Sequence, residues 1–319
     1  MAVPRAKEDE KLRAVESVTW EGLTWVNIER PTERETEYLA KHYPFHPLHL
    51  DDCLSRIQRP KIDESEDYIF IVLHFPVFHK EPRVTVPSQV SIFISENYLV
   101  TVHKGEFKPL TKLFDACQSD ERALKENLGR SSGYLLYRIV DRLVDYCLPI
   151  LDKIIDNMER VEEGIFDKVP RETVREISLL RRDIISYRRI IWPLRAVLGT
   201  LEPKTRRFVK EDMAEYFGDL VDHTDKIWDN LDECKEVIEG LSDTNNSLTS
   251  NRINEVMRVL TIIATIMMPL TVVSSIYGMN IGLPGGLDGG SSATFGVMIG
   301  IMVLIVGGML FFFRRRRWI

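Results

Sequence analysis

The chain is poor in the features that hold small secreted or metal-stabilised proteins together. Its 319 residues include four cysteines that are far apart and form no CxxC pair: Cys53, Cys117, Cys147 and Cys234. This spacing argues against a disulfide framework or a structural zinc site and favours buried free thiols in a reducing compartment. The sequence also lacks a GxxxxGK[ST] motif and a Cys/His cluster at metal-ligand spacing, so we expect neither an enzyme nor an organic cofactor.

Basic charge is scarce in the first 255 residues, which hold 37 basic and 47 acidic side chains. The part from Val256 onward holds five basic residues and one acidic residue. A strongly acidic domain cannot neutralise phosphates, so we expect no nucleic-acid partner. The first 15 residues alternate charges and lack an apolar core, so we expect no cleavable signal peptide and a cytosolic acidic region.

Charge is almost absent from two segments near the C-terminus. Val256–Tyr277 has Arg258 as its one charged residue, and Thr294–Phe313 has none. At about 1.5 Å per residue, each helix would span roughly 30 Å, the thickness of a bilayer core. The segments could also be two buried core helices. Their proximity and the run Arg314–Arg317 that follows favour two membrane spans instead.

Basic residues indicate the orientation of these spans. The loop from Gly278 to Ala293 has no Lys or Arg, whereas Arg252 and Arg258 flank the first span and Arg314–Arg317 follow the second. The positive-inside rule places both termini in the cytosol and the loop outside. We therefore expect a multi-pass protein of the plasma (inner) membrane, in contact with lipid. A nuclear-localisation role for the arginine run is disfavoured by its position directly after Phe311–Phe313.

The cytosolic part combines strand and helix patterns. Strand-like runs cover Val18–Ile28, Tyr68–Phe78, Val90–Ile94 and Tyr98–His103, with a hairpin around 95–97. Helical patterns cover Glu33–His42, Lys108–Asn127, Ser132–Phe166 and Arg171–Leu198. We expect an α+β fold, with a mixed sheet and helices on both of its sides over 1–129. An antiparallel helical hairpin over 130–209 would follow, turning at 167–170.

A heptad pattern follows this hairpin. Mostly apolar residues step alternately by three and four: Phe217, Leu220, Thr224, Ile227, Leu231, Cys234, Ile238 and Leu241. The phase continues into the first span without Pro or Gly. We therefore predict one long helix over 210–277, followed by a loop over 278–293, a second span over 294–313 and a basic tail over 314–319. The alternative is two helices broken between Ser242 and Ser250, where helix formers are poor.

The first span carries a weakly polar stripe on one helical face. Its members are spaced by three and four, with Leu260 beside them: Asn254, Met257, Thr261, Ala264, Met268, Thr271 and Ser275. The opposite face is aliphatic. Such a stripe can line a pore or can pack helices closely through small residues. Leu260 and Met257 could form an apolar constriction, and Pro269 should bend the helix.

A motif at the outer end of the first span identifies a family resemblance. Tyr277-Gly278-Met279-Asn280, preceded by Met268-Pro269-Leu270-Thr271 and followed by a second span and an arginine run, resembles the CorA family of magnesium transport proteins. Gln58-Arg59-Pro60-Lys61 and Ile191-Trp192-Pro193-Leu194-Arg195 also resemble segments of that family. The resemblance covers nearly the whole chain.

The resemblance implies a homopentameric funnel with the first span around the axis. It implies uptake of Mg²⁺, with Co²⁺ and Ni²⁺ as further ions, down the electrochemical gradient. Gly278, Met279 and Asn280 would form the outer selectivity ring, with Asn280 holding a hydrated ion. The pore-lining residues would be Asn254, Met257, Leu260, Thr261, Ala264, Met268, Thr271 and Ser275. Mg²⁺ would also regulate the pore between cytosolic subunits, where Asp219 and Asp243 match the acidic sites of the family.

Two positions depart from the family pattern. His79 stands where the family often has an acidic partner, and Asp288 is the one acid in the loop after Asn280. Two further groups have a zinc-like or acidic composition, namely His42, His46 and His49, and the acids from Asp141 to Asp167. We interpret both groups as surface or solvated side chains, although the acids could concentrate cations by their summed field.

Two alternatives to a magnesium channel remain open from the sequence. One is a zinc-transporting member of the same family. The other, from a different class, is a membrane-anchored coiled-coil scaffold or sensor whose spans serve only as a tether.

Overall fold

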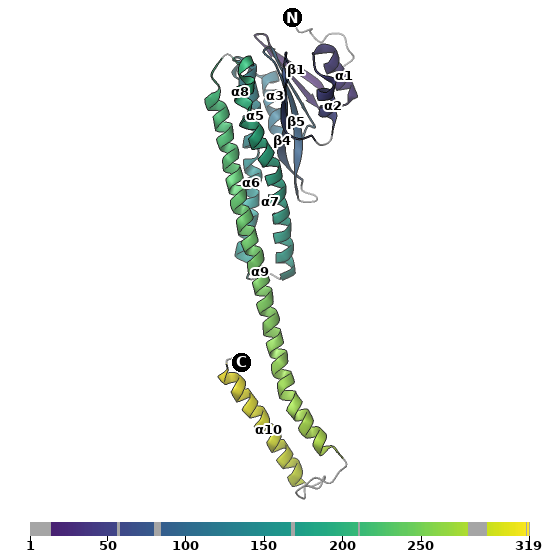
Figure 1. Cartoon of the computed structure of the whole chain (residues 1–319), viewed down its shortest axis with the longest axis vertical. Helices are drawn as coiled ribbons and strands as arrows, with labels where there is room; N and C mark the ends of the chain where they lie inside the picture. The colour runs from purple at the N-terminus through teal and green to yellow at the C-terminus, as the bar shows by residue number, and fades with distance from the viewer. Residues whose placement is uncertain are drawn as a thin grey trace. The chain divides into compact units, whose positions relative to one another are not determined.

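The computed structural model describes residues 14–55, 58–79, 84–166, 170–209, 211–279, 292–316 and 318 (Figure 1). The chain separates into two compact units, Met1–Ser242 and Asp243–Ile319. Helix α9 (Ala214–Tyr277) contributes residues to both units.

The first unit contains a six-stranded mixed sheet in the order β1-β2-β6-β5-β4-β3. The parallel pair is β2–β6, and the other neighbouring strands are antiparallel. This confirms the predicted mixed sheet and the hairpin around 95–97. The strands are β1 (Val15–Trp20), β2 (Leu23–Glu29), β3 (Lys61–Glu64), β4 (Ile69–His79), β5 (Val84–Ile94) and β6 (Tyr98–His103).

The run predicted as one strand over 18–28 is instead the hairpin of β1 and β2. Glu21 and Gly22 form its turn with positive φ angles of 45° and 92°. Two such residues make a tight turn whose twist matches that of the flanking strands. The apolar pattern continues across this turn, so the periodicity concealed it.

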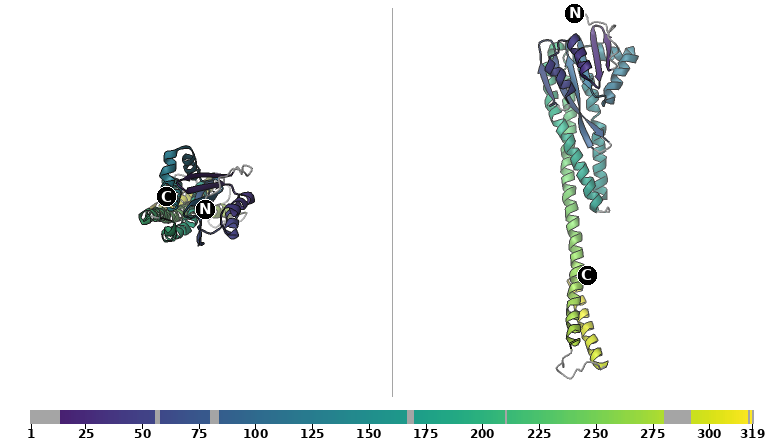
Figure 2. Two further views of the ribbon diagram at one scale, coloured as in Figure 1. Left: turned by 90° about the horizontal axis from the view of Figure 1, so that it is seen from above. Right: turned by 90° about the vertical axis from the view of Figure 1, so that its right-hand side faces the viewer.

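Helices cover both faces of the sheet, as expected (Figure 2). On one face, α1 (Glu33–His42) and α2 (Pro47–Leu54) contribute Leu39 and Leu50 to a core that includes Val26 and Ile28 of β2. On the other face, Trp25 of β2 meets Phe114 of α3 (Lys108–Ser119) at a ring distance of 4.9 Å. Helix α7 (Pro170–Leu198) packs against β4 and β5.

Two segments predicted as single helices are each divided in the structure. α3 ends at Ser119 and α4 (Glu121–Leu128) begins after Asp120, whose carboxylate caps the N–H of Arg122 at 2.9 Å. α5 (Ser132–Asp145) is followed by α6 (Leu148–Gly164), which has Pro149 in its first turn. Proline has no N–H and collides with the preceding turn, which favours the break between the two helices here. A short α8 (Leu201–Thr205) and a 3₁₀ turn (Arg206–Phe208) follow α7.

The heptad seam of α9 lies in the core of the first unit. All eight seam residues predicted from the spacing are buried, with exposed fractions of 7% or less. Phe217 contacts Tyr137 of α5 at 6.4 Å between ring centroids, and Trp228 lies 5.1 Å from Trp192 of α7. The seam is therefore covered by helices of its own chain.

The long helix begins at Ala214, four residues later than predicted, where Asp212 accepts a hydrogen bond from the Ala214 N–H at 3.0 Å. It has no break between Ser242 and Ser250. In that stretch the Thr249 hydroxyl donates to the backbone carbonyl of Asn245 at 2.9 Å. This bond satisfies the hydroxyl of a poor helix former within the helix itself.

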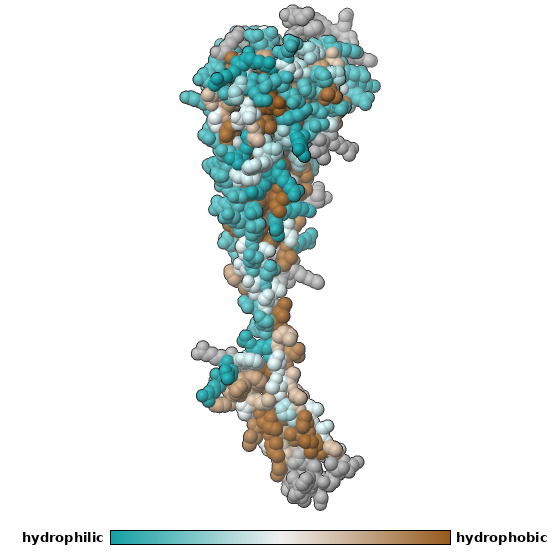
Figure 3. All heavy atoms as spheres, in the orientation of Figure 1, coloured by the Kyte–Doolittle hydropathy of each residue, from teal (hydrophilic) through white to brown (hydrophobic). Residues whose placement is uncertain are grey.

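The second unit contains the end of α9 and helix α10 (Ser292–Arg315). Both helices are long and apolar enough to cross a membrane. In the most apolar 18-residue stretch of each, 6% of the α9 residues and 0% of the α10 residues are buried. The brown apolar side chains of this unit are at the surface in Figure 3. A water-soluble protein would bury most of this area, so the exposure favours surrounding lipid and neighbouring chains.

A buried polar network connects β2 and β6. Oδ1 of Asn27 accepts from the Thr101 hydroxyl at 2.7 Å and lies 3.0 Å from Nε2 of His103. The Gly105 N–H donates to Nδ1 of His103 at 3.1 Å, which leaves the proton of the neutral ring on Nε2. Burial lowers the pKa of His103 to about 4, and the Glu29 carboxylate 3.9 Å away offsets only part of that effect.

This network predicts a loss of stability in acid. Between pH 6.5 and 4 the unfolded chain binds a proton on His103 that the native ring does not accept. The stabilising contribution of the neutral ring is therefore complete above about pH 6.5 and is lost as the pH decreases toward 4. From pH 7 to 4.5 we expect the unfolding free energy of the wild type to fall by about 2–3 kcal/mol relative to His103→Gln. Denaturant unfolding followed by circular dichroism measures this difference. His42→Gln, on the exposed side of α1, is the matched control, and an equal pH dependence in both variants would contradict the prediction.

Candidate functional site

The polar stripe of the first span is exposed along its whole length. The eight residues predicted to line a pore are all solvent-accessible in the single chain: Asn254, Met257, Leu260, Thr261, Ala264, Met268, Thr271 and Ser275. Exposure is not confined to the stripe, since Val256, Val259 and Ile263 on the opposite face are also exposed. The stripe thus leaves its hydroxyl and amide groups open to water or to another copy of the chain.

The threonines of the stripe are partly satisfied by their own helix. The Thr261 hydroxyl donates to the Met257 carbonyl at 2.7 Å, and the Thr271 hydroxyl donates to the Met267 carbonyl at 2.8 Å. These bonds lower the cost of placing hydroxyl groups among apolar side chains. Pro269 lies within the helix and cannot donate a backbone hydrogen bond to the preceding turn.

The helix ends at the motif that carries the family resemblance. The Gly278 N–H donates to the Ser274 carbonyl at 2.9 Å, and the Met279 N–H donates to the Ile276 carbonyl at 3.3 Å. Both residues are exposed. A Cβ atom at Gly278 would lie 3.3 Å from the Ser274 carbonyl oxygen, a tight contact. Asn280 and the rest of the loop to 291, including Asp288, lie outside the described residues.

The acids predicted to bind regulatory ions are not neighbours. Asp219 and Asp243 are both exposed and 24 residues apart along α9. At about 1.5 Å per residue this separation is roughly 36 Å, so one chain cannot hold a single ion with both. Asp219 instead lies 3.6 Å from Nε2 of His223, one turn further along the helix.

His79, at which the sequence analysis expected a departure from the family pattern, lies at the end of β4. Its Nε2 is 4.0 Å from Oε1 of Glu106, and the other carboxylate oxygen of Glu106 accepts from the Ser88 hydroxyl at 2.5 Å. An acidic group therefore remains beside this position, although it comes from a different part of the chain.

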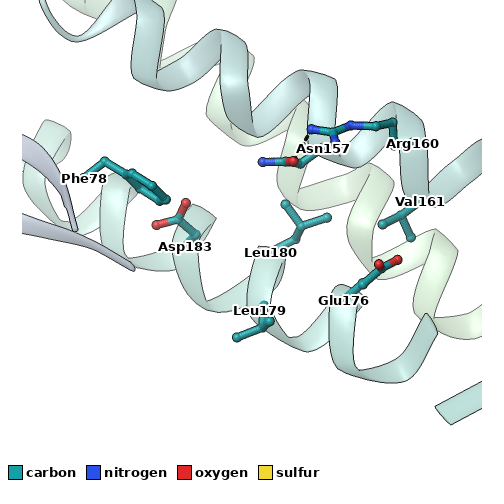
Figure 4. A pocket seen from close by; sticks show the side chains of 8 residues that line it. All are labelled: Phe78, Asn157, Arg160, Val161, Glu176, Leu179, Leu180 and Asp183. Atoms are coloured by element: carbon teal, nitrogen blue, oxygen red, sulfur yellow. Dashed lines mark hydrogen bonds between the residues drawn. The ribbon is translucent and has the colours of Figure 1, made fainter. Parts of the chain in front are cut away.

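A cavity of about 150 Å³ lies between β4, α6 and α7 (Figure 4). Asp183 in its wall accepts a hydrogen bond from the Thr85 N–H at 2.7 Å, and Arg160 donates to Asn157 at 2.5 Å. These polar groups are engaged with the protein, which favours a structural role over an ion pathway. The lining residues are Phe78, Asn157, Arg160, Val161, Glu176, Leu179, Leu180 and Asp183.

The three histidines with zinc-like spacing have structural roles. Nδ1 of His42 bonds to the Tyr38 carbonyl at 2.8 Å, and Nδ1 of His46 caps the N–H of Leu48 at 3.2 Å. His49 bonds to the Tyr68 hydroxyl at 2.8 Å. Among the described residues they are not part of a cluster that could hold a metal ion.

Part of the acidic segment interpreted as solvated has a different environment. Ligand atoms of Asp141, Asp145 and His223 lie within 4.8 Å of one another. Asp141 is partly buried, and its pKa is raised by burial and then by the neighbouring Asp145 carboxylate. His223 was missed by sequence reasoning, because nothing local shows that α9 packs beside α5. Asp167, at the end of this segment, lies outside the described residues.

Comparisons with known proteins agree with the predicted resemblance. The family model described as CorA-like Mg²⁺ transporter protein matches residues 20–315. The cobalt/magnesium transport protein CorA of Thermotoga maritima is 33% identical over 301 residues, covering 93% of this chain and 83% of the relative. The zinc transport protein ZntB of Yersinia enterocolitica is 22% identical over 304 residues, covering 94% of this chain and 89% of the relative.

A solved structure also matches over nearly the whole chain. The complete structure of the CorA magnesium transporter from Methanocaldococcus jannaschii superposes with a TM-score of 0.82 at 27% identity, covering 95% of this chain and 94% of that chain. Members of the matched family are membrane transporters and not enzymes, and the two apolar helices fit that location. The protein described here therefore belongs to the CorA-like family of transporters for Mg²⁺ and other divalent cations.

Proposed function

We propose that this chain assembles as a homopentameric channel that takes up Mg²⁺ down its electrochemical gradient, with both termini in the cytosol. The observation that carries the proposal is the stripe of α9, whose small, polar and sulfur-bearing side chains follow one face of the span as far as Gly278-Met279. Two spans cannot enclose a water-filled path, so the stripe must face copies of itself. In this arrangement Asn254 to Ser275 line the pore, and Met257 with Leu260 forms its apolar constriction.

The ring of Asn280 side chains suits a hydrated Mg²⁺ ion. Mg²⁺ prefers octahedral oxygen ligands and gives up water reluctantly. Neutral amide oxygens accept hydrogen bonds from the ion's water without removing it. A carboxylate ring would hold a bare dication too tightly for conduction, because passage needs weak binding at several sites. Co²⁺ and Ni²⁺ are further candidate ions for this ring.

The membrane potential is sufficient to drive uptake. A divalent charge that crosses roughly 100 mV gains about 4.6 kcal/mol, which corresponds to an accumulation ratio above about 10³. Such a pore needs a closing signal. In the proposal, Mg²⁺ bound between cytosolic subunits at Asp219 and Asp243 holds the assembly closed. When the ion is lost, the like charges repel one another and the subunits loosen.

The scaffold alternative loses its main support in the structure. Its coiled-coil contact would use the heptad seam of α9, and that seam is buried against helices of the same chain. The zinc alternative is supported by the ZntB relative and differs only in the ion.

Replacing Asn280 tests the proposed channel. In proteoliposomes with an inside-negative potential, we expect the wild type to take up Mg²⁺ and Asn280→Ala to lose at least about 90% of that flux, since each subunit then lacks its water-binding amide. Asn246→Ala, an exposed position on α9 before the span, is the matched control and should keep the flux. Absence of flux in the wild type would favour the scaffold, and preferred uptake of Zn²⁺ from mixed cations would favour the zinc transporter.

Replacing the regulatory acids tests the gating mechanism. Asp219→Ala combined with Asp243→Ala should abolish the protection from proteolysis that millimolar Mg²⁺ gives the wild type, because the ion no longer bridges subunits. Asp222→Ala with Asp229→Ala removes two exposed charges from the same helix and should keep that protection. Unchanged protection in the first double variant would refute regulation at these two residues.

A further inference from the structure

A cleft of about 660 Å³ in the first unit lies where two segments singled out in the sequence come together. Residues 58–60, which directly precede β3, form one side of it, and Trp192 and Pro193 of α7 form another. Helix α9 contributes Trp228 and Lys235. The volume is in the range of small-molecule sites, roughly 300–1,000 Å³. Neither segment has a part in the proposed ion path, so their meeting calls for a separate explanation.

The wall of this cleft has the opposite charge to its surroundings. Four of its residues are cationic, namely Arg59, Arg188, Arg189 and Lys235, and none of the described residues that line it is acidic. The first 255 residues of the chain, by contrast, hold 37 basic and 47 acidic side chains. A small anion would therefore be attracted to this cleft more strongly than to the acidic surface around it.

Two of the four cations are available to a ligand. In the part of the chain that the structure describes, neither Arg59 nor Arg189 has a carboxylate oxygen within 4.0 Å, and both residues are exposed. Arg188, between them and α9, is instead paired with Asp232. A guanidinium group presents its N–H donors in a planar fork that matches the oxygens of a phosphate group. The two unpaired arginines thus favour a phosphate-bearing ligand.

An exposed indole ring lies beside these cations. Trp192 is 61% exposed, although it is a large and mostly apolar side chain. Its neighbour Trp228 lies 5.1 Å away between ring centroids, and the guanidinium of Arg188 lies over the Trp228 ring at 4.3 Å. Trp228 is therefore already stacked within the protein, whereas Trp192 keeps open surface. Nucleobases stack on aromatic rings of this kind because every base has a flat π-face.

Pro193 adds a possible contact for a base. Proline has no N–H, so the carbonyl of Arg189, four residues earlier in α7, lacks the donor that it would have in a regular helix. The exocyclic amino group of a nucleobase is a donor of the right kind for a backbone carbonyl.

We propose that this cleft binds a nucleoside di- or triphosphate, with the base on Trp192 and the phosphates on Arg59 and Arg189. An exposed aromatic ring beside unpaired guanidinium groups suits a ligand that combines a flat ring with phosphate groups. An acidic segment of a protein would satisfy the arginines but would give the indole no ring to stack on. The site lies within one chain and does not include any residue of the stripe.

Binding of ATP to the purified full chain in detergent tests the site. In EDTA, so that no metal ion masks the phosphate charge, isothermal titration calorimetry should show saturable binding of one ATP per chain, with inorganic triphosphate bound at least about tenfold more weakly. Trp192→Ala should weaken ATP binding about tenfold and leave triphosphate binding unchanged. Arg189→Ala should weaken both at least about tenfold. Arg181→Ala removes the same charge from an exposed position of α7 and is the matched control.

Further measurements separate this site from the transport proposal and from a site for a neighbouring chain. Asn280→Ala should keep ATP binding even if it loses flux, and circular dichroism checks that every variant folds. Equal affinity of the wild type for ATP and triphosphate would overturn the assignment, as would equal ATP affinity in the Trp192, Arg189 and Arg181 variants. Absence of ATP binding would also overturn it. Dissociation of the oligomer on combining Arg59→Ala with Arg189→Ala would then assign the cleft to an acidic segment of a second copy.

Discussion

Burial of one apolar seam on α9 is the constraint on which the first unit depends. The seam fixes the rotation of the helix about its own axis, because all eight of its members must face the interior of that unit. Every other face of α9 is then determined by the helical repeat. His223 and Asp219 are placed toward α5 by this rotation, and Arg188 and Arg195 of α7 pair with Asp232 and Asp225.

The same periodicity explains how much of the structure the sequence predicts. A repeat of three and four residues identified the seam and the polar stripe, and long uncharged runs identified the spans. These features depend on helical geometry alone. Local breaks were harder to predict, because the turn at Glu21-Gly22 and the cap at Asp120 interrupt segments without interrupting their apolar pattern. The break between α5 and α6 was also missed, although Pro149 in the first turn of α6 is a sequence signal for it.

Contacts between distant segments could not be predicted in this way. His103 and Asn27 are 76 residues apart, yet they share a hydrogen bond because β2 and β6 are parallel neighbours. The cluster of Asp141, Asp145 and His223 likewise requires α5 and α9 to lie together. A single sequence gives no register between these elements, so the acids were interpreted as a solvated helix face and His223 was not singled out. The functional residues implied by the motif at Gly278 came from family resemblance, since composition alone left two explanations for the stripe.

The hydroxyl groups of Thr261 and Thr271 have a consequence for water in the proposed pore. Each hydroxyl donates its one hydrogen to a carbonyl of its own helix. It can therefore act only as a hydrogen-bond acceptor toward the lumen. A water molecule bound to such a wall donates a hydrogen to the threonine oxygen, so its own oxygen faces the pore axis. Rings of these residues would therefore orient water molecules so that their oxygens solvate a positive ion. The lumen would then favour cations over anions without any charged residue on the threonine-bearing face.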